Sequence, residues 1–139
     1  MILVVGSGFL GSRVLKTFAG RTDETIIGTV RDTGNCPDID GVKFTRCDVT
    51  VTAELEALAS LCAQAERVTV FYFAAVHNID YIFDHPRQAR EVNIDSLRNF
   101  LSVMPRIDKL FFASTDCVYG ENPKGELLSE NSPLDPVNR

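Results

Sequence analysis

Residues 1–11 read Met-Ile-Leu-Val-Val-Gly-Ser-Gly-Phe-Leu-Gly, and this stretch decides the fold. The first five residues form a short, uniformly apolar run, which is typical of a strand covered by helices on both faces of a parallel sheet. The run ends at Gly6, and a helical pattern then continues to a stop at Gly20. We expect that helix to bury one apolar face, formed by Phe9, Leu10, Val14, Leu15 and Phe18.

The glycines between this strand and this helix have the spacing G-x-G-x-x-G. A strand before the motif and a helix after it are the context that the dinucleotide-binding fingerprint requires. Gly6 would make the tight turn, Gly8 would let backbone approach a pyrophosphate, and Gly11 would allow close helix–strand packing. The helix N-terminus would offer N–H groups to the phosphates. The predicted cofactor-binding residues here are Gly6, Ser7, Gly8, Phe9, Leu10 and Gly11; a plain glycine-rich turn is the alternative.

Strands and helices alternate along the rest of the chain. The patterns predict strands at 25–30, 42–47, 68–75 and 110–114, helices at 52–65 and 87–104, and turns across 32–41. Such alternation predicts an α/β fold, a Rossmann-type doubly wound parallel sheet with strand order 3-2-1-4-5. We therefore expect a dinucleotide-binding domain over residues 1–120, followed by a loop over residues 121–139.

Composition limits the function classes. The 139 residues carry a net charge of −5 with scattered Lys and Arg, which argues against a nucleic-acid partner. The four cysteines form no C-x-x-C pair, so free thiols in a cytoplasmic protein are expected. The apolar start has no basic flank or cleavage site, and no apolar run approaches the ~20 residues of a membrane helix.

Two further positions bear on the cofactor. Arg31 stands twenty residues after Gly11, where a guanidinium would clamp a 2′-phosphate, which favours NADP; NAD stays possible because Asp32 is one residue away. Asp48 and Val49 close the third predicted strand, where a carboxylate would accept from the adenine amino group and Val49 would cover the ring. Capping of the next helix by Asp48 is an equally open interpretation.

Four later motifs occur in the order found in one enzyme family. Phe73-Ala74-Ala75 is similar to an L-A-A element, and residues 92–96 resemble V-N-x-x-G, with Ser96 in place of the glycine. Residues 114–120 resemble S-[ST]-x-x-V-Y-G, and residues 130–136 match E-x-x-P-x-x-P. Together the motifs cover the chain and resemble the extended short-chain dehydrogenases that act on nucleotide-linked sugars.

The resemblance implies roles for particular residues. Thr115 matches the catalytic hydroxyl that contacts the reacting sugar oxygen, although a strand-end residue that bonds backbone is the alternative. Ala74 and Ala75 would border the cofactor, and Asn93 would tie a helix to the sheet. Cys117 stands where dehydratases of the family have a glutamate, which disfavours dehydration because a thiol is a poor replacement for that base. Neither His77 nor His85 has a partner in sequence reach.

The resemblance implies NAD(P)-dependent epimerisation or 4-keto reduction of a nucleotide-linked sugar. The family's catalytic Tyr-x-x-x-Lys would follow Arg139, so we expect the fold to stop before the catalytic helix and the chain alone to be inactive. An atypical relative that lacks the Tyr/Lys pair and only binds or senses nucleotides is the alternative. Self-association, as a homodimer for example, is expected through the apolar residues 110–113 of the fifth strand.

Overall fold

The computed structural model describes residues 1–121, 125 and 127–136. Its centre is one parallel five-stranded sheet with the order β3-β2-β1-β4-β5, which confirms the predicted topology. Each strand has four or five residues. The strands are β1 (Ile2–Val5), β2 (Ile26–Val30), β3 (Val42–Arg46), β4 (Thr69–Tyr72) and β5 (Lys109–Phe112).

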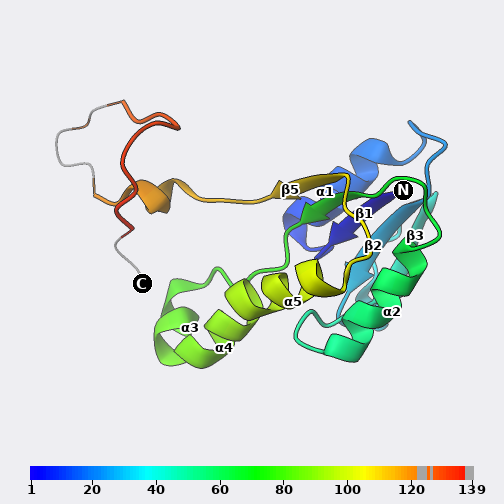
Figure 1. Ribbon diagram of the computed structural model, residues 1–139, viewed down its shortest axis with the longest axis horizontal. Helices are drawn as coiled ribbons and strands as arrows, with labels where there is room; N and C mark the ends of the chain where they lie inside the picture. Colours follow the sequence, from blue (N-terminus) through cyan, green and yellow to red (C-terminus); the bar gives the residue numbers. More distant parts are fainter. Residues whose placement is uncertain (122–124, 126, 137–139) are drawn as a thin grey trace.

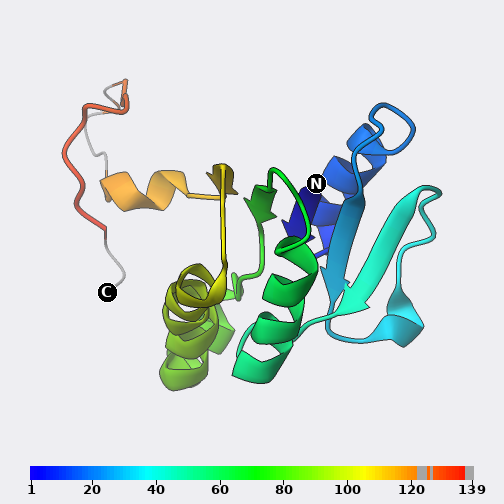
Figure 2. The same ribbon diagram turned by 45° about the vertical axis from the view of Figure 1, so that its right-hand side comes forward.

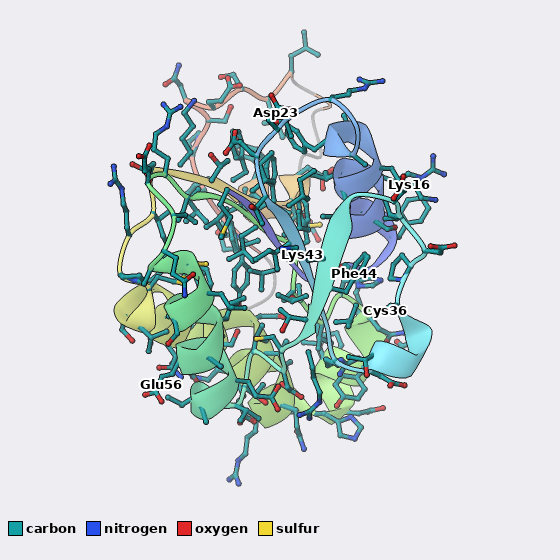
Figure 3. All side chains as sticks on the ribbon, turned by 90° about the vertical axis from the view of Figure 1, so that its right-hand side faces the viewer. Lys16, Asp23, Cys36, Lys43, Phe44 and Glu56 are labelled. Carbon is teal, nitrogen blue, oxygen red and sulfur yellow. The ribbon has the colours of Figure 1, made fainter. Side chains whose placement is uncertain are left out.

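Helices cover both faces of the sheet (Figures 1 and 2). Helix α1 (Phe9–Phe18) lies on one face, and α2 (Thr52–Cys62) and α5 (Ser96–Val103) lie on the other. Figure 3 looks onto the edge strand β3, with α1 and α2 on opposite sides of it. Because side chains alternate along a strand, Ile2 and Val4 pack towards α1, while Leu3 and Val5 pack towards α2 and α5. β1 is therefore buried on both faces, as its sequence predicts.

The first turn of α1 corrects one prediction. Phe9 and Leu10 were expected on the buried helix face, yet they are 78% and 55% exposed. The buried residues of the helix are Gly11 and Leu15, and the predicted Val14 and Phe18 pack, partly buried, against the same core cluster. The ring of Phe9 instead lies under the guanidinium of Arg13, at 5.5 Å.

The helix expected over residues 87–104 is divided into three parts. They are α4 (Pro86–Arg90), a single π-helical turn η2 (Glu91–Asp95) and α5. The buried stripe is nonetheless the predicted one, because Ala89, Ser96, Phe100 and Met104 all face the core. A helix that the sequence pattern did not show, α3 (Ile79–Asp84), precedes it and is capped by the Asn78 side chain, which accepts from the Tyr81 N–H.

The remaining segments fit the turn-rich sequence. Residues 32–41 hold only a short 3₁₀ turn, η1 (Thr33–Asn35), and a second, η3 (Asp116–Tyr119), follows β5. In Figures 1 and 2 the described residues after β5 run away from the sheet. All four residues of β5 are exposed as a result. Within the described residues, no helix has the length and apolarity needed to cross a membrane.

Candidate nucleotide-binding site

The loop after β1 is a tight turn that only glycine fits. Gly6 has φ +92°, and a Cβ on it would stand 2.7 Å from the backbone nitrogen of Ala74. The N–H of Gly6 donates to the Thr29 hydroxyl and the N–H of Ser7 donates to the Thr29 carbonyl, both at 2.9 Å. β2 therefore holds the loop in place from one side, and the end of β4 packs against it from the other.

The other two glycines differ in what surrounds them. A Cβ on Gly11 would overlap the carbonyl oxygen of Gly6, so α1 packs on the loop at a distance that only glycine permits. A Cβ on Gly8 would meet nothing within 4 Å. Gly8 therefore borders open space, although its backbone has φ −71°, a value that any residue adopts.

This open space lies at the N-terminus of α1. Gly8 is the N-cap and supplies no side-chain cap; Ser12 is the first residue whose N–H bonds back, to the Gly8 carbonyl at 2.9 Å. The N–H groups of the first turn lack intrahelical partners and carry a partial positive charge. Among the described residues, the buried hydroxyl of Ser7 also has no hydrogen-bond partner. The loop thus combines donors, positive potential and room for an anionic group.

Arg31 and Asp32 follow β2 directly and have different surroundings. The Asp32 carboxylate accepts from the N–H of Gly34 at 2.9 Å and caps η1. Arg31 is exposed at the end of the strand. The Asp32 carboxylate is thus engaged by its own turn, whereas Arg31 is exposed and its charge acts on Asp48.

Asp48 and Val49 follow β3. The N–H and the hydroxyl of Thr50 both donate to one carboxylate oxygen of Asp48, at 3.0 and 2.7 Å. These hydrogen bonds hold the pKa of Asp48 below its usual value, with smaller contributions from the charges of Arg31 and Arg46. Val49 is 7% exposed and packs in the larger core cluster. Its predicted contact with an adenine ring would involve only this small exposed surface and stays a prediction.

Arg46 and Glu54, which are not among the predicted site residues, lie beside Asp48. The Arg46 guanidinium donates through Nη1 to Glu54 Oε1 at 2.5 Å and through Nε to the Arg31 carbonyl at 3.3 Å. The second oxygen of Glu54 accepts from the Asp48 N–H at 2.6 Å. The pairing of Val30 with Arg46 in the sheet register brings Arg46 next to the Arg31 carbonyl.

The segment after β4 is fixed by a side chain from the π-helical turn. Asn93 accepts from the Val76 N–H at 2.7 Å and donates to the Val76 carbonyl at 2.8 Å. The hydroxyl of Ser96 donates to the Val92 carbonyl at 2.5 Å and lies 2.8 Å from the buried hydroxyl of Tyr72. Ser96, which stands where the resemblance has glycine, therefore ties the π-helical turn to β4.

Ala74 and Ala75 lie in the segment that Asn93 fixes. Ala74 is half-buried against Gly6, and Ala75 is exposed. The sheet therefore brings the end of β4 next to the glycine loop, as the predicted site requires, whereas the predicted cofactor contacts themselves stay predictions.

Thr115 lies after β5, two strands away from the glycine loop. Its exposed hydroxyl accepts from the Cys117 N–H at 3.2 Å, donates to Asp116 Oδ1 at 3.3 Å and caps η3. This is the local backbone role left open as the alternative; the catalytic role stays a prediction. Both histidines are exposed, and His85 stacks on Tyr81 with ring centroids 4.4 Å apart. No group of three or more potential metal ligands occurs among the residues described.

Comparison with known proteins agrees with this arrangement. A family model, the NAD dependent epimerase/dehydratase family, matches residues 2–139. The chain belongs to this family. The resemblance drawn from the short motifs is thereby confirmed at the level of the family.

Several relatives are enzymes of sugar nucleotides. A putative UDP-glucose 4-epimerase of Methanocaldococcus jannaschii is 30% identical over 99% of this chain and 45% of its own length. The dTDP-glucose 4,6-dehydratase 1 of Escherichia coli is 24% identical over 96% of this chain and 42% of its own. The solved UDP-glucose 4-epimerase of Thermus thermophilus, in complex with NAD, has a TM-score of 0.82 and 28% identity over 97% of this chain and 44% of its own. The chain thus spans less than half the length of these relatives.

Proposed function

We propose that this chain forms the cofactor-binding part of an enzyme that epimerises a nucleotide-linked sugar or reduces its 4-keto group. The observation that carries the proposal is the open space at Gly8, bordered by the N-terminus of α1. An anionic pyrophosphate suits this space, because backbone N–H groups and the helix dipole favour negative charge there. The relatives named above support the nucleotide-sugar class.

The residues present fit a nicotinamide dinucleotide. The loop from Gly6 to Gly11 would hold the pyrophosphate, Asp48 would accept from the adenine amino group, and Ala74 and Ala75 would border the nicotinamide side. When bound, the nicotinamide supplies hydride transfer. The protein's part is to orient the cofactor, and the hydrogen bonds of Asn93 to Val76 keep the segment after β4 in position for that task.

Thr115 would contact the reacting sugar oxygen. Its hydroxyl can donate and accept through one atom, so it can follow a change in the protonation of that oxygen. In the structure the hydroxyl caps η3, and substrate binding would replace the hydrogen bonds to Cys117 and Asp116. Dehydration is disfavoured, because Cys117 is exposed beside Asp116 where a dehydratase would place a glutamate.

The cofactor would be NADP rather than NAD. Asp32 caps η1 through its hydrogen bond from Gly34, and Arg31 would be the side chain that contacts the ribose of the adenosine half. A guanidinium binds a 2′-phosphate through charge-assisted hydrogen bonds, whereas an NAD site offers a carboxylate to the ribose hydroxyls.

The test is parallel titration of wild type and Arg31→Ala with NADPH and NADH. Arg31→Ala should weaken NADPH binding by about 1.5–3 kcal/mol, the value of a hydrogen bond to a charged group, and should leave NADH binding within a factor of two. Arg21→Ala, a substitution in the turn after α1, is the matched control. Equal losses for both cofactors would show that Arg31 does not contact a 2′-phosphate.

A second candidate is a nucleotide-binding or sensing protein without the Tyr/Lys pair. The local engagement of Thr115 in η3 favours it, because that hydroxyl has a structural task without any substrate. Turnover of a nucleotide-sugar distinguishes the two candidates. If the chain is part of an enzyme, Thr115→Val should abolish turnover. Nucleotide binding should be unchanged in this variant for either candidate function.

A further inference from the structure

A second arginine lies at the predicted adenosine end of the site. Arg46 is the last residue of β3 and pairs with Val30, so its backbone neighbours the end of β2. Its Nε donates to the Arg31 carbonyl at 3.3 Å, so the Arg46 guanidinium lies next to the backbone of Arg31. The Arg46 side chain is nevertheless 60% exposed. A ligand group that binds near Arg31 would therefore also lie near the Arg46 guanidinium.

Glu54, in the first turn of α2, fixes this guanidinium. Its side chain is 19% exposed, and one of its oxygens pairs with Arg46 Nη1 at 2.5 Å. The other oxygen accepts from the Asp48 N–H at 2.6 Å. The Glu54 carboxylate thus links Asp48, which we expect to contact adenine, to Arg46, which we expect to lie near the ribose. Arg46 uses two of its five N–H donors in the described hydrogen bonds, to Glu54 and to Arg31.

We propose that Arg46 is a second specificity-determining cation for the 2′-phosphate, and that Glu54 is the residue that positions it. The proposal rests on the proposed binding of NADP. A ligand phosphate monoester carries close to two negative charges, and it would accept from the guanidinium donors that Glu54 and Arg31 leave.

The charge balance at this end of the site favours a second arginine for binding a phosphate. Three carboxylates lie near this end, on Asp32, Asp48 and Glu54, so its formal charge is −2 with Arg31 alone and −1 with Arg31 and Arg46 together. Asp32 and Glu54 accept from protein donors, and one oxygen of Asp48 accepts from Thr50. Arg46 supplies a second positive charge, and its link to Glu54 reduces the entropy lost when the long side chain is ordered by a phosphate.

The test uses two adenosine probes that differ only at the 2′ position. Affinities for adenosine 5′-monophosphate and adenosine 2′,5′-bisphosphate are measured by calorimetry, and their ratio reports the 2′-phosphate alone. Arg46→Gln should reduce this ratio about ten-fold or more, and Arg46→Lys should reduce it less, because a point charge replaces a fixed fork. Arg21→Gln is the matched control and should leave the ratio unchanged.

Glu54→Asp tests positioning separately from charge. The aspartate keeps the negative charge but is one methylene shorter, so it cannot reach both Arg46 and the Asp48 N–H. The ratio should fall in Glu54→Asp, and Glu54→Asp should cause no further fall when Arg46→Gln is already present. Additive effects of the two substitutions on the ratio would overturn the positioning role.

The possible failures can be told apart. If wild type binds neither probe, the proposed nucleotide site is wrong and this inference falls with it. If wild type binds both probes equally, the proposed NADP preference is wrong. If wild type prefers the bisphosphate and Arg46→Gln keeps the full preference, the proposed function stands and the role of Arg46 is refuted.

Discussion

The backbone N–H of Gly6 donates a hydrogen bond of 2.9 Å to the hydroxyl of Thr29. Thr29 is 1% exposed and lies on β2, so the neighbouring strand supplies the acceptor that the turn after β1 needs. The Thr29 carbonyl accepts from the next N–H, that of Ser7. The shape of the glycine loop therefore depends on β2 as well as on its own glycines.

Thr29→Val tests this dependence. Valine has nearly the same shape but no acceptor, so the Gly6 N–H would lose its partner. The free energy of unfolding should fall by about 1–3 kcal/mol, measured by urea denaturation. Thr29→Ser keeps the hydroxyl and should retain most of the stability. An unchanged urea midpoint for Thr29→Val would mean that water replaces the hydroxyl and that the bond does not hold the loop.

The reactivity of the cysteine thiols should differ with their burial. Burial raises the pKa of Cys47 to about 11, with help from the charges of Glu54 and Asp48, and burial also raises that of Cys62 to about 11. Thiolate is the reactive form, so at pH 8 an aromatic disulfide reagent should label the exposed Cys117 quickly and these two only after unfolding.

The same shifts set a pH dependence of stability. An unfolded thiol titrates near ~8.5, so the stability that the neutral buried thiols contribute is complete below that pH. It is lost as pH rises through the folded value of about 11. Cys117→Ser should remove the fast labelling phase and leave this alkaline loss unchanged. Fast labelling of Cys62 in the native protein, located by mass spectrometry, would contradict the burial.

The predicted self-association through β5 can be tested by a substitution on that strand. Phe111 and Phe112 are 50% and 53% exposed, and among the described strands β5 pairs only with β4. Apolar edge strands pair with other chains, and a lysine on the edge opposes this pairing. Light scattering should show a mass above that of one chain for wild type and a shift to one chain for Phe112→Lys. Phe83→Lys, on the exposed side of α3, should leave the mass of wild type unchanged. A monomeric wild type would refute the prediction.

The fold was predictable because its signals are local. The apolar run before Gly6, the glycine spacing and the alternation of strands with helices each depend on neighbouring residues, and together they give the sheet order. Helix α3 was missed because its six residues bury no side chain, so no apolar stripe marks them. The π-helical turn was missed for another reason: it depends on contacts of Asn93 with Val76, seventeen residues away in the sequence.

The site was predictable only in part. The glycine loop and Ala74 come together as the motif requires, because Gly6 has no Cβ to keep them apart. The exposure of Phe9 was not predictable from helical spacing, since it depends on where the sheet ends. The link from Glu54 to Arg46 also could not be predicted from the sequence, because it joins side chains of α2 and β3 that no periodic pattern relates.

Substitutions at two glycines of the same loop should differ in their effect on the stability of the fold. Gly8→Val should leave the urea midpoint near that of wild type, because the position has ordinary backbone angles and open space. Gly11→Ala should destabilise the fold, because its new Cβ would overlap the Gly6 carbonyl oxygen. A Gly11→Ala variant as stable as wild type would show that α1 can move away from the loop.

The most direct test of the central claim is titration of wild type and Gly8→Val with NADPH, followed by the cofactor's fluorescence. A branched side chain at Gly8 would fill the space that the pyrophosphate needs, so wild type should bind saturably and the folded variant should lose binding at least a hundred-fold, roughly the value of the phosphate contacts. Gly8→Val that binds NADPH with the affinity of wild type would show that the cofactor does not lie over this loop.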